Sequence, residues 1–202
     1  MIAIIDYGAG NILSVQKALD HIGCDNVVTC DASVISRADG AVLPGVGSFG
    51  DAMDNLTARG LVGAVKDFAA SGKPFLGICL GLQVIFDSSE ESPGVKGLSL
   101  MSGKVRRFPS DMGLKIPHIG WNSIEYDRGC PLFRGLSETP YVYFVHSYYL
   151  DAADQSVVSA VAGYGLDFHA AVWKDNVFAT QFHPEKSGSV GLQILRNFAD
   201  MM

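Results

Sequence analysis

The chain has 202 residues, of which 48% are hydrophobic and 18% are charged. These values are typical of one globular domain, and we expect a single domain over residues 1–202. The formal net charge is −6 without a run of like charges, which argues against a nucleic-acid groove or an anionic membrane surface as a partner. No apolar stretch is long enough to cross a bilayer.

The four cysteines are widely spaced, at positions 24, 30, 79 and 130, and none belongs to a Cys-x-x-Cys pair. This spacing indicates neither a disulfide framework nor a zinc site, and we expect no metal and no cofactor. Residues 1–6 carry no basic leader and are typical of a buried strand rather than a signal peptide. The expected compartment is reducing and cytoplasmic.

The first half of the chain alternates short apolar runs with stretches of helical periodicity, which is typical of parallel strands joined by crossover helices. The predicted strands are residues 2–6, 27–30, 41–44 and 75–78. The predicted helices are residues 12–22, 61–70 and 82–86, with helical spacing also between positions 48 and 53. These elements predict an α/β fold with an open, mostly parallel sheet.

Strands outnumber helices in the second half, where they are predicted at residues 104–108, 123–125, 141–150, 157–162, 169–173 and 177–181. Asp175-Asn176 between the last two is a hairpin signal, so this region adds antiparallel strands to the sheet. A last helix is predicted at residues 189–201, with an apolar stripe from Val190 to Phe198 that would cover the sheet.

The segment Gly77-Ile78-Cys79-Leu80-Gly81 lies where a predicted strand turns into a helix, and it has the Gly-x-nucleophile-x-Gly form of a nucleophile elbow. Glycines on both sides of such a turn let the strand and the helix approach closely. Cys79 would then project from a strained turn at a helix N-terminus, where the helix dipole favours the thiolate. The alternative is that Cys79 is a small buried hydrophobic residue, as most free cysteines are.

A cysteine nucleophile needs a group that accepts a proton and later donates it, and His183-Pro184-Glu185 offers one. Pro184 keeps His183 in an extended conformation. Residues two apart in an extended chain point the same way, so the Glu185 carboxylate can accept the second ring N–H of His183. These are the base and the orienting carboxylate of a triad. The alternative is a surface turn in which Glu185 is solvated.

Three motifs in this order resemble the triad-type (class I) glutamine amidotransferases over nearly the whole chain: Pro44-Gly45-Val46-Gly47, Gly77-Ile78-Cys79-Leu80-Gly81-Leu82-Gln83 and His183-Pro184-Glu185. The resemblance implies a flavodoxin-like, three-layer fold and L-glutamine as substrate. It also implies Cys79, His183 and Glu185 as the catalytic triad. The cysteine would carry a γ-glutamyl thioester, and glutamate and ammonia would be released.

The resemblance also implies roles for residues around the triad. The negative charge of the tetrahedral intermediates must meet backbone N–H donors, and the candidates are Leu80 and the loop residues Val46 and Gly47. The expected glutamine-binding residues are Gly45, Gly47, Gln83, Glu91, His146, Ser147 and Tyr148. For His146, which shares a strand face with apolar neighbours, a packed core histidine is the alternative.

Three further segments resemble, more narrowly, the glutaminase subunits of imidazole glycerol phosphate synthases of histidine biosynthesis: residues 6–11, 117–122 and 146–148. This resemblance implies a (β/α)8-barrel cyclase as partner in a heterodimer. The expected interface residues are Asn11, Pro117, His118, Trp121, Asn122 and Lys186. The alternative for residues 117–122 is a turn at the start of a strand, with Trp121 in the core.

Glycines in the loop at residues 45–47 leave the orientation of the backbone N–H donor to the oxyanion variable. We therefore expect the isolated chain to be poorly active and the partner to order this loop. Two alternative functions remain at this point. One is the glutaminase of a different amidotransferase, and the other is a catalytically silent binding module on the same fold.

Overall fold

The computed structural model describes residues 1–8 and 10–202; Ala9, within the motif at residues 6–11, lies outside the described residues. The helices are α1 Ile12–His21, α2 Ala32–Arg37, α3 Phe49–Ala58, α4 Leu61–Ala70, α5 Leu80–Val84 and α6 Gly188–Ala199, and the short 3-10 helices are η1 Pro131–Phe133, η2 Gln155–Val157 and η3 Pro184–Lys186. Within the part of the chain that the structure describes, no helix has the length and apolar character needed to cross a membrane.

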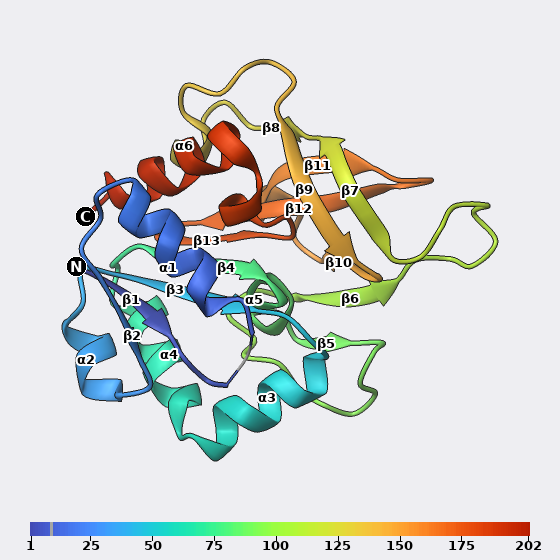
Figure 1. Cartoon of the computed structure of the whole chain (residues 1–202). Helices are drawn as coiled ribbons and strands as arrows, with labels where there is room; N and C mark the ends of the chain where they lie inside the picture. Colours follow the sequence, from blue (N-terminus) through green and yellow to red (C-terminus); the bar gives the residue numbers. More distant parts are fainter. Residues whose placement is uncertain (9) are drawn as a thin grey trace.

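The centre of the fold is a parallel sheet with the strand order β2-β1-β3-β4-β13 (Figure 1). Its strands are β1 Ile2–Ile5, β2 Asn26–Thr29, β3 Gly40–Gly45, β4 Phe75–Cys79 and β13 Val177–Thr180. This is the strand order of flavodoxin-like folds, in which ligands bind outside the carboxyl ends of the strands. Here β3, β4 and β13 bring Gly45, Cys79 and the segment that leads to His183 to one edge.

Helices cover both faces of this sheet, with α1 and α6 on one face and α2, α3 and α4 on the other (Figure 1). Alternate residues of β1 divide between two cores, because Ala3 and Ile5 pack with α2, α3 and α4 while Ile2 and Ile4 pack with α1 and α6. Every residue of β1, β3 and β4 is buried, as expected for parallel strands covered on both faces. The predicted three-layer α/β fold is confirmed.

Antiparallel strands extend the sheet beyond β13. They are β12 Asp167–Lys174, β10 Tyr148–Ala152 and β6 Gly103–Arg107, with β11 Val158–Gly163 and β8 Glu125–Tyr126 branching from β12. The short β5 Ser88–Ser89 at the edge pairs parallel to β6. The predicted hairpin at Asp175-Asn176 joins β12 to β13, and Asp175 has the positive φ of 52° that such a turn requires. The predicted antiparallel region in the second half is confirmed.

The prediction of one strand over residues 141–150 is wrong. The chain forms β9 Tyr141–His146, leaves it at Ser147 and then enters β10. β9 pairs with β7 His118–Ser123 in a separate two-stranded sheet, whereas β10 joins the main sheet. The buried residues are 142, 144 and 146 before the break and 150 and 152 after it. The alternation resumes in the same phase after Tyr148, so the sequence pattern does not reveal the break.

Three smaller differences concern element boundaries. The strand predicted at residues 123–125 is two strands, β7 and β8, of which β7 begins at His118. The elbow helix α5 begins at Leu80, directly after Cys79, rather than at residue 82. Helix α2 was not predicted; its N-cap is Asp31, whose carboxylate accepts from Ser33 N at 2.7 Å.

The two glycines of the elbow permit close backbone contacts. A Cβ atom at Gly81 would lie 1.9 Å from the carbonyl oxygen of Leu43 in β3. A Cβ atom at Gly77 would lie 2.9 Å from the backbone of Gly81. Both distances are too short for any side chain, so glycine is needed at both positions for β3, β4 and α5 to pack together.

We expect Gly81→Ala to lower the free energy of unfolding by more than about 2 kcal/mol, because the methyl group would push α5 away from β3. The matched control is Gly63→Ala in α4, where no atom lies within 4 Å of the added Cβ. Alanine at this exposed helical position should raise stability by about 0.5–1 kcal/mol. Urea denaturation of both variants is the measurement, and a Gly81→Ala variant as stable as the parent would contradict this packing.

Candidate active site

Cys79 is the last residue of β4 and has a strained backbone, with φ 55° and ψ −104°. A positive φ is costly for a residue with a side chain and persists only where the surrounding packing enforces it. Here the contacts at Gly77 and Gly81 enforce it. The Cys79 side chain is buried at the carboxyl edge of the sheet, in the position of a nucleophile at an elbow.

His183 and Glu185 meet in the way that their spacing predicted. His183 has an extended backbone, with φ −100° and ψ 98°, directly before Pro184. Its Nδ1 atom lies 2.7 Å from Glu185 Oε1, and both side chains are fully buried. The alternative of a surface turn with a solvated Glu185 is therefore wrong.

Residues from distant segments hold this pair in place. The Asn11 side-chain amide donates a short hydrogen bond to the Glu185 carboxylate that also binds His183. His183 N donates to the carbonyl oxygen of Tyr143 in β9, and Ser187 Oγ accepts from Tyr143 N. Asn11, which we expected at the partner interface, thus points inward to the carboxylate, and β9 positions the backbone of the histidine.

The surroundings of His183 favour its charged form. Burial by itself lowers the pKa of His183, but the side chains of Cys79 and Glu185 outweigh burial and raise the pKa to about 10. Cys79 influences the pKa of His183, while the buried His183 Nε2 atom has no hydrogen-bond partner among the described residues. A charged imidazole beside a cysteine is the arrangement expected for a cysteine nucleophile.

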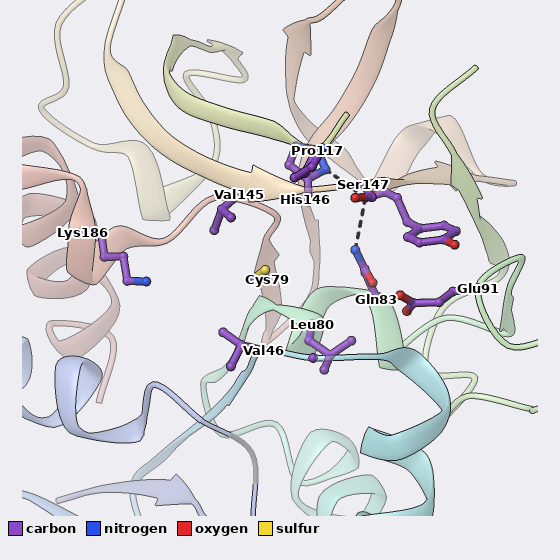
Figure 2. Close-up of a pocket in the computed structure, with 12 residues that line it drawn as sticks. Val46, Cys79, Leu80, Gln83, Glu91, Pro117, Val145, His146, Ser147 and Lys186 are labelled. Atoms are coloured by element: carbon purple, nitrogen blue, oxygen red, sulfur yellow. Dashed lines mark hydrogen bonds between the residues drawn. The ribbon is translucent and has the colours of Figure 1, made fainter. Parts of the chain in front are cut away.

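A pocket of about 410 Å³ opens beside Cys79. It is lined by Val46, Gly47, Cys79, Leu80, Gln83, Glu91, Pro117, Val145, His146, Ser147, Tyr148 and Lys186. Figure 2 shows Val46 and Leu80 on one side of the Cys79 sulfur, with His146 and Ser147 across from them. The β3 and β4 edge therefore forms one wall of the pocket, and the junction of β9 and β10 forms the other.

The expected glutamine-binding residues occupy different places in this pocket. Glu91 Oε2 accepts from Phe49 N at 2.8 Å, so one carboxylate oxygen holds the start of α3. Gln83 donates from Nε2 to the Tyr148 carbonyl oxygen at 3.2 Å (Figure 2). His146 borders the pocket but is buried, with its ring bound inside the protein, so the alternative of a packed core histidine holds for its ring.

Gln181 is a site residue that the sequence did not indicate. Its side chain is fully buried, and its Nε2 atom donates toward Cys79 Sγ at 3.7 Å. Its Oε1 atom accepts from Gln83 Nε2 at 3.1 Å. Gln181 lies two residues before His183 on the same strand end, so the alternation that placed Glu185 beside His183 is the signal that would have found it.

The Tyr7 hydroxyl packs closely against Gly45 at the end of β3. A Cβ atom at Gly45 would lie 2.2 Å from the Tyr7 hydroxyl, so Gly45 has a packing role and is not among the residues that line the pocket. Burial raises the pKa of Tyr7, and the charge of Cys79 raises it further. The next loop residues, Val46 and Gly47, are exposed at the pocket, and Gly47 has a φ of 108° that only glycine adopts freely.

Exposed apolar residues of β7 lie beside the pocket. Trp121 is 56% exposed and Ile119 is 58% exposed, so the alternative of Trp121 as a core residue is wrong. His118, which we expected at the partner interface, is buried, because alternate residues of a strand point to opposite faces. Pro117 and Lys186 are exposed at the rim of the pocket.

Known proteins are similar to this chain in sequence, and solved structures are similar to it in fold. The sequence model of the family Glutamine amidotransferase class-I matches residues 3–202. This chain belongs to the class-I glutamine amidotransferases. Within that family it is 56% identical to the imidazole glycerol phosphate synthase subunit HisH of Syntrophotalea carbinolica, over 100% of both chains. The HisH subunit of Methanosarcina barkeri is 52% identical over 99% of this chain and 98% of that protein.

Solved amidotransferase structures have the same architecture. One described as a glutamine amidotransferase superposes with a TM-score of 0.78 at 18% identity, over 100% of this chain and 98% of that one. The glutaminase domain of Trypanosoma brucei CTPS with bound acivicin superposes with a TM-score of 0.69 at 18% identity, over 100% of this chain and 94% of that one. These superpositions cover nearly the whole chain, and so extend over its antiparallel half as well as over the parallel sheet.

We expect His183 of this amidotransferase to stay protonated from about pH 6 to pH 9, because its pKa is raised to about 10. His118 should stay neutral over the same range, because burial lowers its pKa to about 4. The contribution of His183 to folding stability is then present below its unfolded pKa of about 6.5 and is lost as the pH rises through its folded pKa. NMR of ¹⁵N-labelled histidine rings measures both charges, and a His183 ring that deprotonates near neutral pH would contradict the expected ion pair.

Proposed function

We propose that the chain, as one domain over residues 1–202, is the glutaminase subunit of an imidazole glycerol phosphate synthase and hydrolyses L-glutamine to glutamate and ammonia. The observation that carries this proposal is the buried pair of His183 and Glu185 beside a strained Cys79, in a chain 56% identical to a HisH subunit. We expect the reaction to take place in the cytoplasm, as the cysteine pattern predicted.

The first half of the reaction forms a thioester. The Cys79 thiolate attacks the side-chain amide carbon of glutamine, and negative charge develops on the former carbonyl oxygen. Backbone N–H groups of Leu80 and of the loop at Val46 and Gly47 are the proposed donors to this oxyanion. The His183 imidazolium donates its Nε2 proton to the amide nitrogen, the carbon–nitrogen bond breaks, and ammonia leaves.

The second half of the reaction returns the enzyme to its starting state. Neutral His183 takes a proton from a water molecule, and the resulting hydroxide attacks the thioester carbon. The second tetrahedral intermediate collapses, expels the Cys79 thiolate and gives glutamate. Glu185 accepts the Nδ1–H of His183 throughout, so it fixes the orientation of the ring and stabilises its charged form.

The pocket provides groups for the amino-acid end of glutamine. Glu91 uses Oε2 for the start of α3, and its other oxygen is the proposed acceptor for the α-amino group. Gln83 uses its amide nitrogen within the protein, which leaves its Oε1 atom as the group for the substrate. Ser147 and Tyr148 line the opposite wall, where their hydroxyl and backbone groups meet the ligand.

Ammonia must pass to a second active site before bulk water protonates it, so a synthase partner has to dock over this pocket. We propose that the partner is a (β/α)8-barrel cyclase, which uses the ammonia to form imidazole glycerol phosphate. The proposed docking surface contains Trp121 and Ile119 of β7 together with Lys186 at the pocket rim. Aromatic residues are enriched at the centres of protein interfaces, which favours Trp121 as an anchor.

Cys79→Ala should abolish the glutamine-dependent activity of the complex reconstituted with its cyclase and leave the ammonium-dependent activity intact. The reason is that the substitution removes the nucleophile without touching the synthase site on the partner. Both activities are measured as formation of imidazole glycerol phosphate. A Cys79→Ala complex that still used glutamine would exclude Cys79 as the nucleophile.

Two measurements separate this function from the alternatives. A diazoketone analogue of glutamine should label Cys79 in the parent, and an unlabelled chain would indicate a silent binding module. The nucleotide substrate of the cyclase should stimulate glutamine hydrolysis by the complex above that of the isolated chain. Full activity of the isolated chain would contradict the expected dependence on the partner, and no stimulation would favour the glutaminase of another amidotransferase.

Trp121→Ala should weaken binding of the cyclase roughly tenfold or more, because truncating a central aromatic anchor removes buried contact area. The matched control is Met202→Ala, an exposed apolar residue beside Gly40 at the opposite, amino edge of the sheet. Isothermal titration calorimetry measures both affinities. Equal affinities for the two variants and the parent would show that β7 is not the docking strand.

A further inference from the structure

A line of polar groups crosses the protein interior from β7 toward the nucleophile. Asn122 Nδ2 lies 3.5 Å from His118 Nε2. His118 Nδ1 lies 3.0 Å from His146 Nε2. His146 Nδ1 lies 2.8 Å from the carbonyl oxygen of Tyr148, and the same oxygen accepts from Gln83 Nε2 at 3.2 Å.

The Tyr148 carbonyl oxygen determines where every proton of this line sits, because a carbonyl can only accept. His146 must therefore donate from Nδ1. Burial lowers the pKa of both histidines and keeps the rings neutral, so His146 Nε2 has no hydrogen and accepts from His118 Nδ1–H. His118 Nε2 then also lacks a hydrogen and faces the Asn122 amide, which donates to the Gly163 carbonyl oxygen at 2.8 Å as well. Both neutral rings thus have the same Nδ1–H tautomer.

Aromatic neighbours surround the two rings. The His118 ring lies 4.0 Å from the Tyr164 ring and 4.9 Å from the Phe144 ring, and both pairs are stacked. The His146 ring lies 5.0 Å from the Phe168 ring. Burial lowers the pKa of His118 to about 4 and that of His146 to about 3. Leucine or phenylalanine would pack here without burying polar nitrogens, so the histidines need a reason other than packing.

The line continues through two amides on the far side of Tyr148. Gln83 Nε2 has two hydrogens, and they go to the Tyr148 carbonyl oxygen and to Gln181 Oε1. With its oxygen used in this way, Gln181 must turn its Nε2 toward Cys79 Sγ, at 3.7 Å. The orientations of both amides therefore depend on the position of one carbonyl group.

We propose that His118 and His146 are positioning residues for the glutaminase reaction. They hold the Tyr148 carbonyl, so that Gln83 presents its oxygen to glutamine and Gln181 presents an N–H to the Cys79 sulfur. Neither histidine touches the reacting atoms. This inference rests on the proposed role of Cys79 and adds the residues that orient its surroundings.

His146→Asn and His146→Leu form a matched pair of variants. Asparagine and leucine have nearly the same shape, and asparagine keeps a nitrogen donor at the position of Nδ1 while leucine keeps none. If His146 served packing alone, the leucine variant would be the more stable one and would use glutamine at least as well, because the site is lined by aromatic rings. Positioning predicts the opposite order for glutamine use, with a glutamine KM about tenfold higher for leucine than for asparagine.

The assay is the reconstituted complex, with glutamine-dependent and ammonium-dependent synthesis measured beside thermal unfolding. We expect leucine to unfold at the higher temperature, asparagine to have the lower glutamine KM, and the ammonium-dependent rates to be equal. Equal glutamine KM values in the two variants, or a lower value for leucine, would overturn the proposal. Glutamine-dependent activity in Cys79→Ala would instead overturn the proposed nucleophile, so the two failures are distinguishable.

A second pair of variants tests the same line farther from the pocket, if substitutions at His146 prevent folding. His118→Asn keeps the donor toward His146, and His118→Leu removes it, so the same order of glutamine KM values is expected. Gln181→Met should not add its full effect to that of His146→Leu, because both act through one set of hydrogen bonds. Fully additive effects on log kcat/KM would show that the two residues act independently.

Discussion

The left-handed backbone of Cys79 is the constraint on which the rest of the site depends. It requires β4 to stop and α5 to start within one residue, and this is possible only because Gly81 contacts the carbonyl of Leu43 and Gly77 contacts Gly81. The Cys79 side chain, the proposed nucleophile, therefore lies at the edge of the sheet where neighbouring strands also end. The loop after β3, Gln181 and the pair of His183 and Glu185 all lie around this sulfur.

The two halves of the fold contribute different chemistry to one pocket. The parallel half supplies Cys79, the proposed nucleophile, and the N–H groups of Leu80 and of the loop after β3, the proposed oxyanion donors. The antiparallel half supplies the wall formed by β9 and β10, and the end of β13 leads to His183. Burial by itself lowers the pKa of His183, and the adjacent side chains of Cys79 and Glu185 outweigh this effect and raise the pKa.

Local sequence patterns predicted the parts of the site that lie within one element. The glycines around Cys79 predicted the elbow, and Pro184 predicted the extended geometry that places Glu185 beside His183. Apart from Gln181, the features that the sequence did not indicate depend on contacts between elements. The pairing of His118 with His146 depends on a strand that changes sheets at Ser147, and neither periodicity nor spacing marks that change. The inward turn of Asn11 likewise depends on how α1 meets η3, which are far apart in the sequence.

The small sheet of β7 and β9 has a consequence for partner binding. One of its strands carries the exposed ring of Trp121, and the other holds His183 through both backbone groups of Tyr143. A protein bound at Trp121, as proposed, would therefore contact the same two-stranded sheet that positions the His183 backbone. Binding on the outer face of β7 and the orientation of the imidazole are thus coupled through a single pair of strands.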